Sequence, residues 1–267
     1  MNRWIPMSSL IALLAACGGS GGASVNAAVA KSFTYAAPQA PSTSEQGIAT
    51  AAQGQLSATA DFSAAPNADK ATALVVFAEA IVAAALNGPA VPMPHPSAVG
   101  FSRALTQADF SGCTTKTATS VTFKGCATQQ GGLTSTLSGT VSVAADVVTW
   151  DVTGGVSGTS TNGITVNVNL HEAGNSSVTA TKISGKALSE SGGTVSGQGK
   201  SFSFGLATAV LMDLTYQSSP TSCVTAGTLE AKRVWTQKPS GVSGVPNDAA
   251  VKLTWTGCNA FQVAHGT

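Results

Sequence analysis

The three histidines are the first candidates for chemistry, because an imidazole can bind zinc or exchange a proton near neutral pH. They are His95, His171 and His265, and no two of them have a spacing that brings ligands together on one face of a helix or strand. His171 stands beside Glu172 on the polar side of an alternating segment, where we expect a solvated pair. His95 lies between prolines in a spacer loop, and His265 lies near the end of the sequence, where fraying opposes a precise site. The histidines therefore predict no metal site and no cofactor.

Neither the serines nor the basic residues form a complete reactive motif. Residues 155–159 differ from the G-x-S-x-G nucleophile elbow, because the second glycine comes one place early and the segment lies among strands. Residues 199–201, Gly-Lys-Ser, are like the end of a phosphate-binding loop, but Thr194 stands where that loop requires glycine. A solvated strand face is favoured over an anion site for the basic cluster of Lys232, Arg233 and Lys238.

The acidic residues leave one enzymatic possibility open, since paired carboxylates can meet in space without being close in sequence, as in glycosidases. Asp213 is the most distinctive, because it lies between Met212 and Leu214 in a segment that is apolar on both faces. An acid there must find a partner or have a raised pKa, and a hydrogen bond to a nearby Thr, Tyr or Lys is the favoured outcome. We therefore assign no catalytic residue. A dispersed acid–base site would draw on Asp146, Asp151, Glu172, Asp213 and Glu230.

The N-terminal residues have the order of an export signal. Arg3 is followed by an apolar run over residues 5–16, which is shorter than the about 20 residues of a membrane span. The run ends in Leu-Ala-Ala-Cys at positions 14–17, which resembles the lipobox of bacterial lipoproteins. The resemblance implies that residues 1–16 are removed and that Cys17, now the first residue, carries acyl chains on its thiol and amine.

Lipidation of Cys17 would make the membrane a permanent partner, because two or three acyl chains, at about 0.8 kcal/mol per buried methylene, hold a protein durably. Gly18 stands where many lipoproteins retained in the inner membrane have aspartate, so the resemblance points to the outer membrane. Ordinary cleavage after the small-x-small segment 28–30 is the alternative, but that segment lies far beyond the apolar run. A disulfide at Cys17 would leave one of five cysteines unpaired.

The four other cysteines allow three pairings, of which we predict Cys113 with Cys126 and Cys223 with Cys258. The residues between the first two are typical of a turn and a returning strand, so this hairpin brings its own ends together. Cys223 begins one predicted strand and Cys258 follows another, and adjacent antiparallel strands would place them side by side. A metal site of four thiolates is the alternative, but no C-x-x-C spacing exists and the compartment is oxidising.

The charge balance gives no support for binding nucleic acid. Removing the signal takes Arg3 from the 13 basic residues and nothing from the 12 acidic ones, so the mature chain is formally neutral. Charged residues make up only 9% of the chain, against about 25% in average globular proteins. Small polar residues must therefore solvate most of the surface, as suits a secreted β protein.

The mature chain divides into a tether and one domain. Residues 17–66 are rich in Ala, Gly, Ser, Gln and Pro, and we predict that most of them form a flexible tether spanning roughly 35 to 40 Å. Residues 67–267 would form the domain, which opens with a helix. Asn67 is its N-cap, and residues 71–86 are almost wholly apolar, so this helix is expected to be buried.

After the helix, apolar and polar residues alternate, which predicts β-strands. Residues 164–170 form such a strand, and the dipeptides at 162–163 (Asn-Gly) and 174–175 (Gly-Asn) predict tight turns on either side of it. Residues 209–216 are apolar on both faces, which predicts a central strand covered on both sides. We therefore expect a mainly β fold, an antiparallel meander sheet curved around the buried helix, with a β-sandwich as the alternative. Further strands are predicted at 141–143, 147–152, 178–183, 202–206, 229–235, 251–255 and 261–263.

Three classes of function fit these observations. A lipid-anchored, non-catalytic envelope module that binds a protein partner or packs within the cell surface is favoured, because complete reactive motifs are lacking and the surface is small and polar. An apolar-ligand or lipid carrier is the first alternative, since a curved sheet and a helix can enclose a cavity. A hydrolase that uses dispersed acids and His171 is the second.

Overall fold

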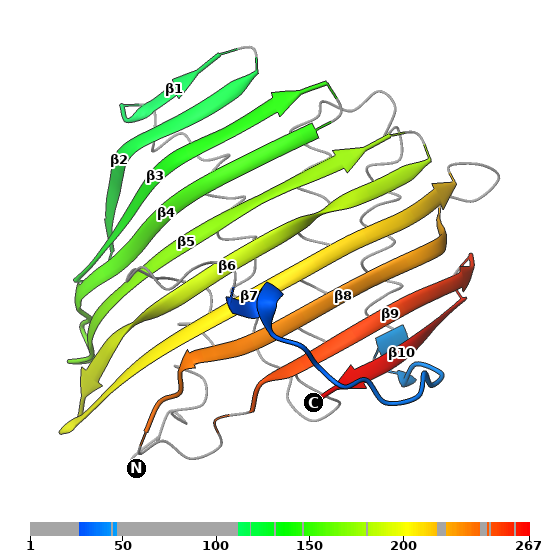
Figure 1. Cartoon of the computed structure of the whole chain (residues 1–267). Helices are drawn as coiled ribbons and strands as arrows, with labels where there is room; N and C mark the ends of the chain where they lie inside the picture. Colours follow the sequence, from blue (N-terminus) through cyan, green and yellow to red (C-terminus); the bar gives the residue numbers. More distant parts are fainter. Residues whose placement is uncertain are drawn as a thin grey trace.

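A computed structural model describes residues 27–43, 45–46, 112–117, 119–130, 132–145, 147–179, 181–217, 223–240, 245, 247–258 and 260–267. Its ten strands form one antiparallel sheet in which neighbours in the chain are neighbours in the sheet (Figure 1). This is the predicted meander, and the described strands lie in one sheet rather than in the two of a β-sandwich. The strands are β1 (Thr114–Lys116), β2 (Ser120–Gln130), β3 (Leu133–Ala144), β4 (Val147–Thr159), β5 (Thr165–Val178), β6 (Lys182–Gly197), β7 (Lys200–Gln217), β8 (Cys223–Gln237), β9 (Ala249–Gly257) and β10 (Ala260–Gly266).

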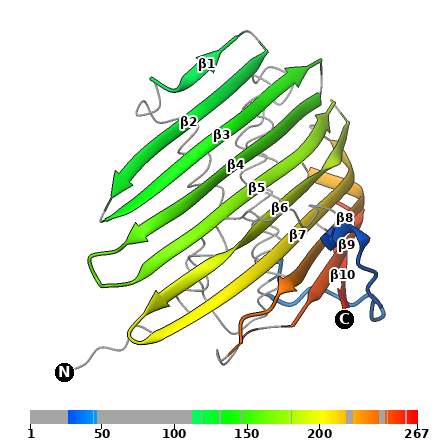
Figure 2. The same ribbon diagram turned by 60° about the vertical axis from the view of Figure 1, so that its left-hand side comes forward.

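The sheet is curved and has two unlike faces. Figure 2 shows β8 to β10 turning away from the plane of β2 to β7. The face that we call the core face carries apolar side chains from nine neighbouring strands, and on it Trp255 and Phe261 pack with ring centroids 5.5 Å apart. Burial of this face is the main driving force for the fold. Its most deeply buried side chains, each at most 2% exposed, include Val152, Val168, Ile183, Leu214, Leu229 and Val251.

The opposite face, which we call the polar face, carries the side chains that alternate with those of the core face, among them Asp151, His171 and Glu190. It is covered over part of β7 and β8 by α2 (Ala27–Ala30), a helix of four residues. Ala28 of this helix and Ala209 of β7 are 0% and 1% exposed. Strand β7 is therefore covered on both sides, as predicted, but here the cover comes from residues 27–30.

The apolar helix predicted within residues 67–86 lies outside the described residues. None of the helices in the described ranges is long and apolar enough to cross a membrane.

Residues 27–39, which we call the N-terminal strap, belong to the segment predicted as a flexible tether, yet they are bonded to the sheet. Backbone hydrogen bonds join Ala36 to His265 (2.9 Å) and, in both directions, Gln39 to Val263 (2.9 Å each). The strap thus pairs with the outer edge of β10 and occupies backbone groups that an edge strand otherwise leaves open. Composition did not reveal this, because small polar residues suit an irregular edge strand as well as a free linker.

One of the two predicted turns is present and the other is not. The chain reverses at residues 160–164, where Gly163 has a φ of 73° and its N–H donates to the Ser160 carbonyl oxygen. At Gly174 the prediction is wrong, because β5 continues through residues 174–175. The Trp150 ring packs across Gly174 so closely that a Cβ there would lie 2.4 Å from it. This glycine therefore provides room for a side chain of the neighbouring strand.

The strand predicted at 178–183 is also wrong, since β5 ends at Val178 and β6 begins at Lys182, so the chain reverses inside this range. The Thr179 N–H donates to the Lys182 carbonyl oxygen (2.9 Å), which closes the reversal. Strand β6 was missed, because it is rich in glycine and serine and shows little alternation.

Candidate functional site

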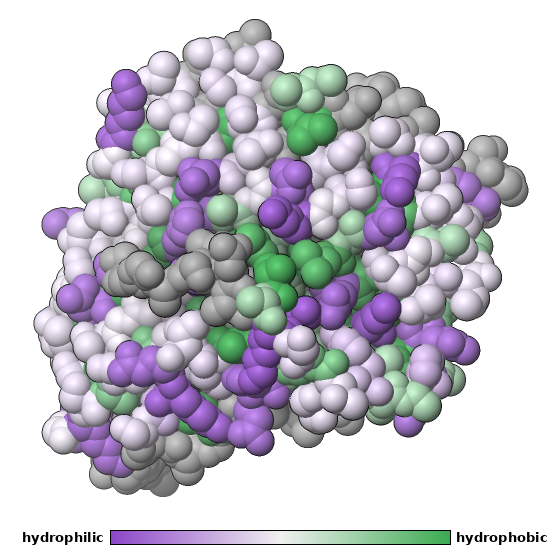
Figure 3. All heavy atoms as spheres, in the orientation of Figure 1, coloured by the Kyte–Doolittle hydropathy of each residue, from purple (hydrophilic) through white to green (hydrophobic). Residues whose placement is uncertain are grey.

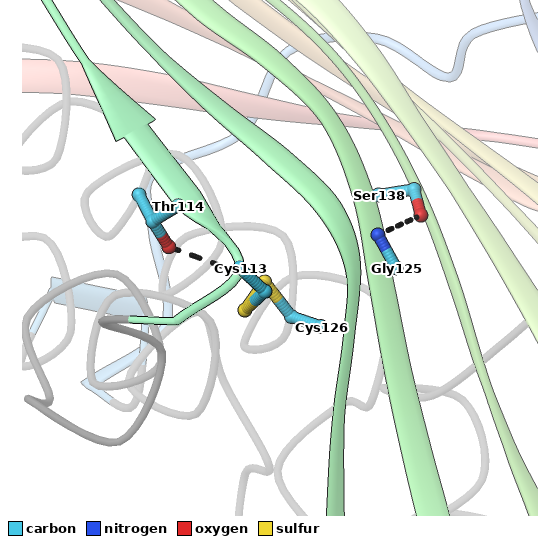
Figure 4. The surroundings of a disulfide bond; sticks show 5 residues. All are labelled: Cys113, Thr114, Gly125, Cys126 and Ser138. Carbon is cyan, nitrogen blue, oxygen red and sulfur yellow. Dashed lines mark hydrogen bonds between the residues drawn. A yellow bond between two sulfur atoms is a disulfide. The ribbon is translucent and has the colours of Figure 1, made fainter.

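Two disulfides join the cysteine pairs that the sequence predicts, Cys113–Cys126 and Cys223–Cys258. The first, the β1–β2 disulfide (Figure 4), lies at a bulge in β2, where the register with β3 shifts between Phe123 and Cys126. Gly125 forms this bulge with a φ of 60° and donates its N–H to the Ser138 hydroxyl oxygen (3.0 Å). The second, the β8–β9 disulfide, joins the start of β8 to the turn after β9. Cys17 lies outside the described residues.

A first group of charged side chains fixes the N-terminal strap to the loop before β9. The Lys31 ammonium donates to Asp248 Oδ2, and the backbone N–H of Trp235 donates to Asp248 Oδ1 (2.7 Å). Burial alone would raise the pKa of Asp248, but the hydrogen bonds from Lys31 and Trp235 outweigh it and lower the pKa below its ordinary value. Asp248 is thus held as a carboxylate that bridges the strap and β8.

A second group lies where the strap crosses β8. Lys232 is only 8% exposed, and its ammonium donates to the carbonyl oxygens of Val29 (3.4 Å) and Lys31 (3.2 Å). The same ammonium lies 3.5 Å from Glu230 Oε1, which accepts a hydrogen bond from the Tyr35 hydroxyl (2.5 Å). Burial, followed by the bond to Glu230, raises the pKa of Tyr35. The strap is therefore held through its backbone by Lys232 and through a side chain by Glu230.

The basic cluster predicted as a solvated strand face is divided between different contacts. Because Lys232 is buried against the strap, the prediction is wrong for this residue: its strand face is covered by a segment distant in sequence. Arg233, its neighbour on the other face, donates to the Asn247 carbonyl oxygen (3.3 Å), and burial lowers its pKa. Lys238 donates to the Asn247 side chain oxygen (2.8 Å). These three residues therefore form no common anion site.

Asp151, His171 and Glu190 form an acid–imidazole–acid row across β4, β5 and β6 on the polar face. His171 Nε2 lies 2.9 Å from Asp151 Oδ1, and His171 pairs in register with Glu190. Burial raises the pKa of Glu190, and the nearby His171 opposes this shift. Glu190 Oε1 is buried and has no hydrogen-bond partner among the residues that the structure describes. The pairing of His171 with Glu172 was wrong, because Glu172 follows it in the strand and lies on the core face.

The other predicted acids do not converge. Asp213 forms an exposed ion pair with Lys182 (2.8 Å), which is the lysine partner expected among its outcomes. Asp151 on β4 and Asp213 on β7 are three strands apart, which separates them by at least about 14 Å at the usual strand spacing, too far for a carboxylate pair that acts on one bond. Glu230 holds the strap, and Asp146 lies outside the described residues. The acids therefore serve separate contacts.

The remaining histidines are also separate. His265 Nε2 lies 3.2 Å from Glu45 Oε1, and His95 lies outside the described residues. Among the residues that the structure describes, no group of three or more His, Cys, Asp or Glu side chains could hold a metal ion.

Sequence reasoning missed Lys31, Tyr35 and Asp248, which have no local signal because each gains its role from a partner about 200 residues away. One signal could have shown that this region is structured. Ser42 and Glu45 have the spacing of a helix capping box, and the Ser42 N–H donates to Glu45 Oε2 (2.7 Å) while the Glu45 N–H donates to Ser42 Oγ (3.3 Å).

Comparison with known proteins gives no relative for this chain: no family model, no curated protein and no solved structure matches it.

Proposed function

We propose that the protein is a lipid-anchored lipoprotein of the bacterial cell envelope that acts as a non-catalytic binding or structural module. The observation that carries the proposal is the use made of its charged side chains. Lys31, Glu230, Lys232 and Asp248 fasten the strap, and Asp213 is paired across strands. Three of these side chains, Asp213, Glu230 and Lys232, are ones that the sequence offers for chemistry, and they hold the fold together, which supports a protein whose role is to present a surface.

The strap also supports cleavage before Cys17 over cleavage after residue 30. Ala28 is fully buried against Ala207, Ala209 and Val234, so cleavage after residue 30 would remove a packed element from the domain. A signal peptide is discarded and has no reason to pack in the mature core. The two disulfides support the same compartment, because disulfides persist in oxidising surroundings such as the bacterial envelope.

Labelling with radioactive palmitate in a bacterium tests the anchor. We expect the wild-type protein to incorporate label and sediment with membranes, and Cys17→Ser to do neither. The matched control replaces both cysteines of the β1–β2 disulfide by serine and should still label, because the acyl chains are expected on Cys17. A Cys17→Ser protein that labels and sediments like the wild type would refute the lipoprotein proposal.

A hydrolase is the second candidate, and the contact between His171 and Asp151 is the observation that favours it. A carboxylate 2.9 Å from the ring can orient an imidazole, as an acid–base catalyst requires. Purified protein would be assayed on chromogenic esters and glycosides. The hydrolase hypothesis requires an activity that disappears in folded His171→Ala. The activity should persist in Lys182→Ala, because the ion pair of Lys182 with Asp213 lies elsewhere on the sheet.

A further inference from the structure

The course of the N-terminal strap determines where the chain approaches the sheet from its N-terminal side. Followed toward the N-terminus, the strap runs along the edge of β10 from Gln39 to Thr34 and then crosses onto the polar face, where it ends as α2 over β7 and β8 (Figure 1). Strand β7 lies three strands in from β10, or about 14 Å at the usual strand spacing. The chain therefore reaches Ala27 above the polar face and inside the perimeter of the sheet.

This point of approach is fixed by contacts spread along the strap. Ala28 is buried against β7 and β8, and the carbonyl oxygens of Val29 and Lys31 accept hydrogen bonds from Lys232. The ion pair of Lys31 with Asp248 holds the next part of the chain. Backbone and side-chain bonds act together here, so the strap belongs to the folded domain rather than to a linker.

Only nine residues, 18–26, lie between Cys17 and α2. Ten residue-to-residue steps span at most about 35 Å when fully extended, and a flexible chain of this length has a root-mean-square span of roughly 17 Å. This root-mean-square span is about half of the roughly 35 to 40 Å expected for the tether that composition predicts. A lipidated Cys17 would therefore hold the polar face close to the bilayer.

We propose that the polar face is the membrane-facing surface of the domain and lies against the lipid headgroups. This inference rests on the proposed lipid anchor at Cys17. The chain geometry favours a lipid surface as the binding partner of this face, because a segment of only nine residues joins Cys17 to α2 on the polar face.

The chemistry of the polar face suits headgroups that are mostly zwitterionic or weakly charged. Figure 3 shows residues of near-neutral hydropathy, drawn white, over much of this face, with strongly hydrophilic residues, drawn purple, between them. The charges are mixed, since Lys182 pairs with Asp213 and Asp151 pairs with His171. Hydroxyl and amide groups can exchange hydrogen bonds with phosphates and esters, while the mixed charges give little long-range attraction. The contact would thus depend on the anchor rather than on salt-sensitive attraction. Its short polar side chains include Thr149, Thr153, Ser157, Asn167, Asn169 and Asn175.

Fluorescence quenching in vesicles tests the orientation with a matched pair of positions. Ser135 and Thr136 are consecutive in β3, are both exposed, and point to the core face and the polar face respectively. With Cys17 lipidated and the other four cysteines in disulfides, Ser135→Cys and Thr136→Cys would each provide one free thiol for a fluorophore. The full lipidated chain would be placed in vesicles of phosphatidylethanolamine and phosphatidylglycerol that contain a headgroup-linked spin label.

We expect the spin label to quench the Thr136→Cys fluorophore at least about threefold more than the Ser135→Cys fluorophore, because the sheet places the two labels on opposite sides, roughly 10 Å apart. The ratio should persist at high salt and approach one when Lys232→Met loosens the strap. Equal quenching, or stronger quenching from Ser135→Cys, in vesicle-bound protein would overturn the orientation.

Two other results separate the possible failures. Protein that carries no acyl chain and does not bind the vesicles would contradict the proposed anchor rather than the orientation. Weak quenching at both positions in vesicles, with Thr136→Cys shielded from thiol reagents in whole cells, would mean that a protein partner occupies the polar face, and the lipid proposal would be rejected.

Discussion

Replacing Lys232 by methionine should detach the N-terminal strap while leaving the sheet folded. The substitution keeps an apolar stem of similar length but removes the ammonium that donates to the carbonyl oxygens of Val29 and Lys31. It also leaves Glu230 with the Tyr35 hydroxyl and without the ammonium 3.5 Å away. Hydrogen bonds that involve a charged group contribute about 1.5–3 kcal/mol each, and Lys232 is only 8% exposed, so water replaces them poorly.

We expect the free energy of strap opening to fall by about 2 kcal/mol, which corresponds to about 30-fold faster amide exchange in the strap. The amides to follow are those of Thr34, Ala36 and Gln39, which donate to backbone carbonyl oxygens at the end of the chain and in β10. Hydrogen exchange followed by mass spectrometry reads this segment separately from the sheet.

Lys186→Met is the matched control, because Lys186 is an exposed lysine of the same face, on β6. It should change the free energy of strap opening by less than about 0.5 kcal/mol, the usual limit for surface substitutions. Unchanged exchange at Ala36 and Gln39 in Lys232→Met, together with faster exchange in β7 and β8, would refute the reasoning, because Lys232 would then support the sheet and not the strap.

The remaining predictions concern pH, the disulfides and one glycine. The folded-state pKa of Asp248 is lowered, so its carboxylate stabilises the fold at pH above its ordinary value of 3.8 and loses this effect as the pH falls through the folded pKa. The protection factors of the strap amides, which correct for the pH dependence of intrinsic exchange, should therefore fall in acid in the wild type and depend less on pH in Asp248→Asn. Replacing both cysteines of a disulfide by alanine should lower the free energy of unfolding by about 3 kcal/mol for the β1–β2 disulfide and about 4 kcal/mol for the β8–β9 disulfide. These values follow from the loop-entropy model, since the paired cysteines are 13 and 35 residues apart. Urea unfolding measures both losses, and equal or reversed losses would contradict the loop argument. Gly174→Ala should cost about 1–3 kcal/mol through overpacking, because its Cβ would meet both the Trp150 ring and the Lys186 carbonyl oxygen at 2.4 Å; a variant as stable as the wild type would show that the ring can move aside.

The sequence by itself determined the class of the fold and the pairing of the cysteines. Alternation with period two specifies strands with one apolar face, and short reversals between them specify an antiparallel meander, since neighbouring strands in such a chain pair first. The cysteine pairs followed from the same reasoning, because residues at the ends of adjacent antiparallel strands are necessarily close.

Predictions from local sequence were wrong where the conformation of a residue depends on a side chain that is distant in sequence and close in space. Gly174 belongs to a dipeptide typical of turns, but it lies within β5, where the Trp150 ring of the neighbouring strand β4 occupies the space above it. Glycine allows a turn and also allows close approach of a bulky side chain, and sequence alone does not distinguish these uses. Strand β6 was missed for a related reason, since its small side chains carry little periodic signal.

Only the tertiary structure decided how the charged and polar residues are used. Lys232 has the pattern of a solvated lysine, and Tyr35 lies in a segment typical of a linker, yet both become partners of Glu230 when the strap folds back on the sheet. His171 gains Asp151 as its partner because the register of β4 and β5 places them diagonally on one face. These contacts join residues distant in the chain, and each depends on the strand register and on packing, which are properties of the folded whole rather than of any local segment.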